Sequence, residues 1–220
     1  MKLPFTADQF LEIFKSYNES IFPIQIIFYL IAAIALFLLF SSTDKSRIIS
    51  LILSFFWLWI GIVYNIIFFS KINKAAYLFG SLFIMQGIIF FIYGIVSNKL
   101  ILRYNKNILN KTGIIFISYA LIVYPVLGYF LGRPYPYSIT IGLPCPTTIF
   151  TFGILLFSEK KIPFAALIIP LLWSIMGFTA ALNFSVYEDF GLILSGLISF
   201  TLLTIQNRNA AWKQKQFERS

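Results

Sequence analysis

A single cysteine between two prolines is the feature of this sequence best suited to chemistry. Cys145 lies between Pro144 and Pro146, and it is the one cysteine in the 220 residues. If Pro146 is the first residue of a helix, Cys145 is its N-cap, where free backbone N–H groups and the positive end of the helix dipole point. An anion, a carbonyl oxygen or a metal-bound thiolate could be held at such a position.

Hydroxyl side chains follow the cysteine closely, from Thr147, Thr148 and Thr151. We expect polar side chains of other segments to surround this group and complete a small-solute site, namely Asn65, Tyr124 and Asn183. A purely structural interpretation is also open. In that case the prolines set a turn, Cys145 packs as a small apolar residue, the hydroxyls bond back to helix carbonyls and the asparagines join neighbouring helices.

The residue types that are missing exclude several kinds of site. The chain has no histidine, which excludes a Ser–His pair and the histidine-based zinc sites of hydrolases. No Asp, Glu, Lys or Arg lies inside its long apolar segments, although proton pumps and ion-coupled carriers usually depend on such groups. Segment 190–205 has no lysine for a retinal Schiff base. We therefore expect no catalytic residue, no metal site, no cofactor and no enzymatic activity.

The composition indicates that these residues belong to a membrane protein. Hydrophobic residues make up 59% of the chain and charged residues 11%, and the mean hydropathy is +0.86. Such a chain is too apolar for an ordinary soluble domain. A helix of about 20 apolar residues spans a bilayer, and seven segments reach or approach that length: 21–40, 48–69, 75–96, 113–131, 146–158, 162–182 and 190–205. We predict an all-α fold of seven transmembrane helices, the fifth of which is short.

The first 20 residues have a different pattern. Thr6 and Gln9 form a capping-box pair that opens a helix. Apolar residues from Phe10 to Tyr17 then recur at helical spacing, with charged residues on the opposite face. This pattern predicts an amphipathic helix over 1–20 that lies on the membrane surface.

The loops between the apolar segments indicate the orientation. Lysine and arginine number twelve on the side of the C-terminus and five on the side of the N-terminus, and basic loops stay in the cytoplasm. We predict one transmembrane domain over 21–206 with its N-terminus outside, followed by a basic cytoplasmic tail over 207–220, in the inner membrane of a bacterium. The net charge of +9 fits contacts with anionic lipid headgroups, and we expect no binding to nucleic acid.

Two acidic residues, Glu188 and Asp189, precede the last segment on the predicted outer side. One interpretation is that they cap the next helix, whose N-terminal dipole favours negative charge. The other is an outward-facing mouth that attracts cations. The stretch from Arg133 to Tyr137 is expected to be an extended outer loop that could cover the region of Cys145.

Four stretches of the chain carry a resemblance: WLWIGIVYN at 57–65, AAYLFG at 75–80 with QG at 86–87, YPVLGYFLGRPYP at 124–136, and GLPCPTTIFTFG at 142–153. They resemble a family of small bacterial multi-pass inner-membrane proteins of unknown function. The PCPTTIFT block is the most specific part, and the resemblance covers essentially the whole chain. It implies a multi-helix membrane fold and brings no activity, substrate or cofactor.

Two function hypotheses follow. The leading one is a small transporter or channel-like permease for a small neutral or anionic solute, with its site around Cys145 at the outer end of segment 146–158. The alternative is a non-transporting membrane sensor or partner subunit, whose basic inner loops and tail recruit another protein. Membrane lipids are expected partners in both cases, and a homo-oligomer is compatible with both.

Overall fold

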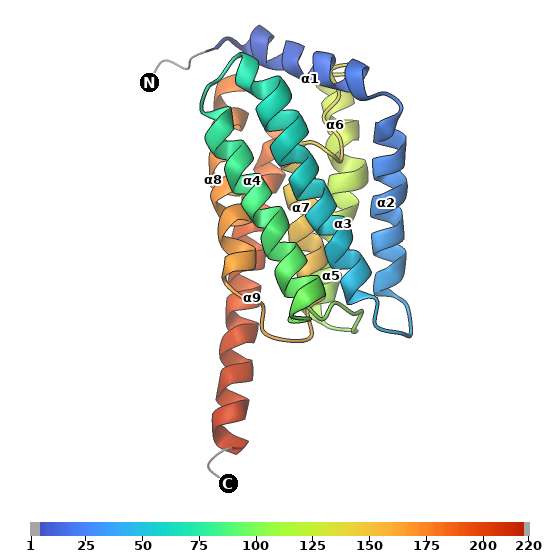
Figure 1. Ribbon diagram of the computed structural model, residues 1–220, viewed down its shortest axis with the longest axis vertical. Helices are drawn as coiled ribbons and strands as arrows, with labels where there is room; N and C mark the ends of the chain where they lie inside the picture. The colour runs from blue at the N-terminus through green and yellow to red at the C-terminus, as the bar shows by residue number, and fades with distance from the viewer. Residues whose placement is uncertain (1–4, 218–220) are drawn as a thin grey trace.

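A computed structural model describes residues 5–217 of the chain, and within them all regular structure is helical apart from two isolated β-bridges. The all-α class is therefore confirmed. Residues 1–4 of the predicted surface helix and residues 218–220 of the predicted tail lie outside the described residues. Figure 1 shows an elongated bundle, with one helix lying across its end and another extending beyond it at the opposite end.

Helix α1 (Ala7–Ile21) is the element that lies across the end of the bundle. The predicted capping box is confirmed, because Thr6 Oγ1 accepts from the Gln9 backbone N–H at 3.2 Å and the Thr6 N–H donates to Gln9 Oε1 at 2.9 Å. The apolar face, including Phe14 and Tyr17, is buried against the other helices. The chain then bends by 86° into α2 (Ile24–Leu39). Pro23 is therefore at the bend, as the N-cap of α2, and the apolar helix predicted from residue 21 begins at Ile24.

The other helices run along the bundle and are locally interrupted. α3 (Ser46–Trp59) continues through the π-helix η1 (Ile60–Phe68) and η2 (Phe69–Lys71), and α4 (Ala76–Phe91) through the π-helix η3 (Ile92–Val96). α5 (Ile108–Ser118), the π-helix η4 (Tyr119–Val123) and α6 (Tyr124–Phe130) form one rod. α7 (Pro144–Leu155), α8 (Ala165–Phe184), η5 (Tyr187–Asp189) and α9 (Phe190–Phe217) complete the fold.

Two helix ends differ most from the sequence-based expectation. α5 begins at Ile108 and not near 113, because the Asn107 side chain caps it by accepting the Asn110 N–H at 2.8 Å. α9 continues to Phe217 and not to 205, so the tail predicted from 207 belongs in large part to a helix. In Figure 1 the C-terminal part of α9 projects beyond all its neighbours.

The helices are compatible with a membrane protein. Within residues 5–217, five are long and apolar enough to cross a bilayer, and the bent pair α1–α2 makes a sixth if it is counted as one span. The remaining apolar helix, α7, has 12 residues, or about 18 Å at 1.5 Å per residue, which is shorter than a bilayer core of about 30 Å. Every α7 residue except Cys145 is buried. A helix that is enclosed by other helices does not need to match the thickness of the lipid itself.

Reciprocal pairs of glycines allow α7 and α4 to approach their neighbours closely. A Cβ added to Gly153 of α7 would lie 2.9 Å from the Gly113 carbonyl oxygen of α5, and one added to Gly113 would lie 2.7 Å from the Gly153 oxygen. Gly61 of η1 and Gly80 of α4 form the same arrangement, at 2.9 and 2.8 Å. Small residues that let two backbones touch are typical of helix pairs in membranes.

Replacing Gly153 by alanine should therefore destabilise the contact between α5 and α7. The new methyl group would also lie 2.7 Å from Ile117 Cγ1, so the helices must separate or strain. We expect a loss of about 1–3 kcal/mol in the free energy of unfolding, measured by titrating the purified protein in mixed micelles with SDS. Ala33→Val adds bulk at an exposed position of α2 and serves as the control, with an effect below about 0.5 kcal/mol. Equal effects of the two substitutions would contradict the close packing.

Candidate functional site

A buried ion pair lies at the end of the bundle that α1 covers. Arg133, from the loop after α6, and Glu188, from η5, are both almost fully buried, and Arg133 Nη2 donates to Glu188 Oε1 at 2.5 Å. Arg133 Nη1 also donates to the Ser185 carbonyl oxygen at 3.3 Å. The stretch from Arg133 to Tyr137, expected only as an outer loop, thus contributes a charge to the interior of the protein.

Two further contacts fix the position of Glu188. Tyr119 Oη donates to the Glu188 backbone carbonyl at 2.9 Å. Gly128 of α6 leaves the space that the carboxylate occupies, since a Cβ there would lie 2.8 Å from Glu188 Oε1. The π-helix η4 carries Tyr119 and directly precedes α6, so one irregular rod supplies both supports.

Asp189 is the neighbouring charge, and it is 1% exposed. Tyr124 Oη donates to Asp189 Oδ1 at 2.6 Å. Asp189 directly precedes α9, as the capping interpretation requires. Among the described residues, however, the hydrogen bond to its carboxylate comes from Tyr124 and not from the N-terminal N–H groups of α9. The buried cluster then holds two carboxylates and one guanidinium.

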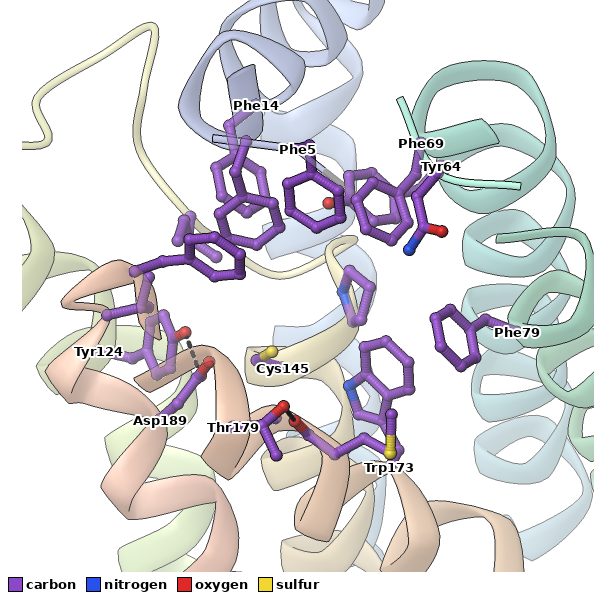
Figure 2. A pocket seen from close by; sticks show the side chains of 18 residues that line it. Phe5, Phe14, Tyr64, Phe69, Phe79, Tyr124, Cys145, Trp173, Thr179 and Asp189 are labelled. Carbon is purple, nitrogen blue, oxygen red and sulfur yellow. Dashed lines mark hydrogen bonds between the residues drawn. The ribbon is translucent and has the colours of Figure 1, made fainter. Parts of the chain in front are cut away.

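Asp189 faces a cavity of about 150 Å³ that lies beneath α1 (Figure 2). Phenylalanines of α1 and its N-terminal flank cover one side, and the other walls come from η1, η2, α4, α6, α7, α8, η5 and the loops between them. The aromatic lining residues are Phe5, Phe10, Phe14, Tyr64, Phe69, Phe79, Tyr124, Trp173 and Phe184, and the remaining ones are Asn73, Ile139, Pro144, Cys145, Met176, Gly177, Thr179, Val186 and Asp189. The cavity is thus an aromatic chamber that contains one carboxylate.

Cys145 lies in this cavity, between Asp189 and Trp173 in Figure 2. It occupies the first turn of α7 and is not the N-cap, because the helix begins at Pro144 and its N-cap is Leu143. This position weakens the expected anion site. Pro144 and Pro146 have no N–H, and the Thr147 N–H already donates to the Leu143 carbonyl at 3.2 Å.

The three threonines lie outside the cavity lining, and their hydroxyls are engaged in the fold. Thr148 Oγ1 donates to the Pro144 carbonyl and Thr151 Oγ1 to the Thr147 carbonyl, both at 2.8 Å. Thr147 Oγ1 accepts the Gly142 N–H at 3.0 Å, and Trp57 Nε1 donates to Thr151 Oγ1 at 3.0 Å. These contacts match the structural interpretation of the hydroxyls.

The two expected asparagines are also not part of the cavity lining. Asn65 is fully buried in η1 and donates to the Ile60 carbonyl at 3.1 Å. Asn183 is exposed on α8 and donates to the Thr179 carbonyl at 2.6 Å. Of the seven site residues predicted from sequence, the structure therefore brings Cys145 and Tyr124 to the cavity.

Sequence reasoning did not place Asp189, Trp173 or the α1 phenylalanines in the site. The available signal was the position of Asp189 at the start of a span, which had suggested a mouth that attracts cations. Trp173 gave no signal, since one more aromatic residue in an apolar helix is unremarkable. Within the described residues, no group of three or more His, Cys, Asp or Glu side chains could hold a metal ion.

The substitution Arg133→Met should destabilise the protein by about 3–5 kcal/mol, because Glu188 would become a buried and unpaired charge. The double variant Arg133→Met, Glu188→Gln should recover much of this loss, since the pair is then neutral. Unfolding in SDS measures both. Lys15→Met is the control, because its contact with Glu12 is exposed and 3.9 Å long, and it should cost at most about 1 kcal/mol. A double variant as unstable as the single one would contradict a dominant role for the ion pair.

Comparisons with known proteins give one match. Residues 7–214 match the family of unknown function DUF6064. No curated protein and no solved structure matches the chain. The family match includes the cavity walls from Phe10 to Asp189 and spans almost the whole sequence. The expectation of a family without an assigned function is thereby confirmed, and the chain belongs to the family of unknown function DUF6064.

Proposed function

We propose that the protein crosses a membrane seven times, with α7 as one crossing and the N-terminus outside. The ends of α7 support this topology. The loop before it is tied to α1, since Tyr17 Oη donates to the Gly142 carbonyl at 2.9 Å. The loop after it is tied to the segment before α5, since the Glu159 N–H donates to the Ile101 carbonyl at 2.9 Å. Figure 1 shows these two regions at opposite ends of the bundle.

The distribution of basic residues supports the orientation. Lysines and arginines gather in the loops at the end opposite to α1, including Lys99, Arg103, Lys106 and Lys160. Basic loops remain in the cytoplasm. The bacterial inner membrane is the location that we propose, with anionic lipid headgroups as partners of this basic end.

Within this topology, the protein is best explained as a small-solute permease and not as an enzyme. The observation that carries the proposal is the cavity beneath α1, which combines an aromatic lining with the buried Asp189 carboxylate. Small-molecule sites are typically apolar cavities with a few convergent polar groups. The cavity lies at the proposed outer end, where a solute would enter from outside.

Helix α1 is suited to act as the cover of this cavity. Its C-terminal end is held by polar contacts, since Asn18 Nδ2 donates to the carbonyls of Pro136 and Ser138 at 2.6 and 2.7 Å. Its N-terminal part contacts the bundle through aromatic rings, with Phe10 and Phe184 centroids 4.6 Å apart. Among the described residues, the side-chain hydrogen bonds between α1 and other segments come from Glu12, Tyr17 and Asn18, so the part of α1 before Glu12 lacks this anchoring. The N-terminal part of α1 is therefore the portion that we propose to lift when a solute enters.

Transport can be tested with the purified protein in liposomes and three labelled probes of different charge: glycerol, formate and choline. We expect at least one probe to enter faster than in protein-free liposomes. Benzyl methanethiosulfonate should slow that uptake, because it attaches a ring to Cys145 inside the cavity. In the Cys145→Ala variant the same reagent should leave the measured rate unchanged. Uptake of all three probes at the protein-free rate would contradict the permease proposal.

The projecting part of α9 favours a second candidate, a membrane sensor or partner subunit. Removing residues 210–220 tests this second candidate. The truncation keeps Asn207, whose side chain accepts the Ile162 N–H at 3.0 Å and donates to the Ile162 carbonyl at 2.9 Å. If the protein is a permease, the truncated form should fold and keep its uptake rate. Loss of function in cells with unchanged folding and uptake would favour the partner role instead.

A further inference from the structure

We infer that the cavity beneath α1 binds a small organic ammonium ion. This inference rests on the proposed solute-binding role of the same cavity and adds the chemical class of the solute. Four properties carry it: the charge balance of the buried cluster, the aromatic walls, the volume, and one unpaired donor.

In its ionised form, Asp189 gives the cluster a net negative charge at the cavity. Arg133 pairs with Glu188 at 2.5 Å. Asp189 accepts a hydrogen bond from the neutral hydroxyl of Tyr124. Among the described residues it forms no ion pair. The N-terminus of α9 offsets part of this charge, by about half an elementary charge. A buried carboxylate without a full counter-charge is costly and tends to take up a proton, so a cation beside Asp189 would stabilise its ionised form.

The aromatic lining supplies a second attraction for a cation. Tyr64, Tyr124 and Trp173 line the cavity together with phenylalanines, and the faces of these rings carry negative electrostatic potential. Cation–π contacts of this kind recognise alkylated ammonium groups, and they are strongest where water is excluded. A simple metal cation is a poorer fit, because a lone carboxylate cannot replace its hydration shell.

The size and the remaining polar group narrow the class further. A cavity of about 150 Å³ resembles in volume an engineered cavity of about 150 Å³ that holds benzene. Trp173 Nε1 is buried and has no hydrogen-bond partner among the described residues. An unpaired buried donor is unfavourable. A ligand that carries an oxygen near its ammonium group, as an amino alcohol does, would satisfy Asp189 and Trp173 together.

The same geometry disfavours an anionic solute. The carboxylate of Asp189 lies beside Cys145, at the position where the helix N-terminus was expected to attract an anion. The α7 N-terminus also offers few donors, because Pro144 and Pro146 lack N–H groups. An anion in this cavity would meet like charge at close range.

Protection of Cys145 tests the inference, because this sulfur lines the cavity and the chain has no other cysteine. The rate at which methyl methanethiosulfonate modifies Cys145 is measured with choline present and, separately, with 3,3-dimethyl-1-butanol present. This alcohol is the neutral isostere of choline, with a carbon atom in place of the nitrogen. At the same concentration, we expect choline to slow the reaction at least about tenfold and the isostere to slow it far less, since only choline gains the charge interaction.

The matched variants are Asp189→Asn and Asp8→Asn. The first keeps an oxygen for Tyr124 and removes the charge, so the protection by choline should fall to that of the isostere. Asp8 is an exposed aspartate of α1 outside the cavity lining, and its variant should keep full protection. The wild-type comparison of the two ligands decides the question even if Asp189→Asn does not fold.

Equal protection by choline and its isostere, or reaction of Cys145 without protection by either, would overturn the inference. If Cys145 does not react, the shift in melting temperature decides: stabilisation by choline alone supports the ammonium site, and no shift overturns it. The liposome uptake is a separate readout. Protection of Cys145 by choline without uptake of any probe would support the ammonium site and contradict the permease proposal. Uptake of glycerol or formate without protection by choline would support the permease proposal and contradict the ammonium site.

Discussion

The burial of three formal charges at one end of an apolar helical bundle is the constraint on which the site depends. Arg133, Glu188 and Asp189 are at most 7% exposed, in a chain whose long apolar segments contain no charged residue. The cluster holds together because each group has a partner close by, and the partners come from different elements. α6, the loop after it and η5 are thereby fixed relative to one another around the cavity.

Some of the helix interruptions lie beside the charged cluster and the cavity. Tyr119 of η4 donates a hydrogen bond to the backbone of Glu188, and Tyr124 of α6 donates one to the side chain of Asp189. Gly128 of α6 leaves space for the Glu188 carboxylate. η1 provides Tyr64 for the cavity wall. π-helical turns inside longer helices are frequent at functional sites, because they redirect side chains that a regular helix would point elsewhere. In the part of the chain that the structure describes, two of the three π-segments supply residues that contact the cavity or the charged cluster.

Much of the fold could be predicted from the sequence. Apolar segment lengths gave the helical class, and the Thr6–Gln9 pair gave the start of α1. The inward position of Asp189 could not be predicted, because it depends on a short turn: Ser185 adopts φ of 56° and η5 follows at once. A residue at the start of a span can face the lipid boundary, the water or the bundle interior. Periodicity does not distinguish these directions when only a few residues separate two helices.

The short helix α7 shows a second limit of sequence reasoning. Its threonines resemble a polar lining in sequence, but each bonds to backbone or to Trp57 inside the packed core. The Gly113–Gly153 contact leaves no space for a solute along that face. The free volume lies at the N-terminal end of α7, where aromatic side chains of α1, η1 and α8 meet without filling the space. The neighbouring helices decide which side of a fully buried helix faces a cavity. The sequence therefore indicated the Cys145 region, but it did not indicate most of the residues that line the cavity with it.

The central claim is that the Asp189 carboxylate holds the positive charge of a bound solute. The most direct measurement is a crystal structure of the protein soaked with tetramethylarsonium, whose arsenic atom scatters anomalously. We predict an anomalous peak inside the cavity, between the Asp189 carboxylate and the rings of Tyr124 and Trp173, and its loss in Asp189→Asn crystals. An empty cavity at saturating concentration, or a peak that is unchanged by the substitution, would contradict the claim.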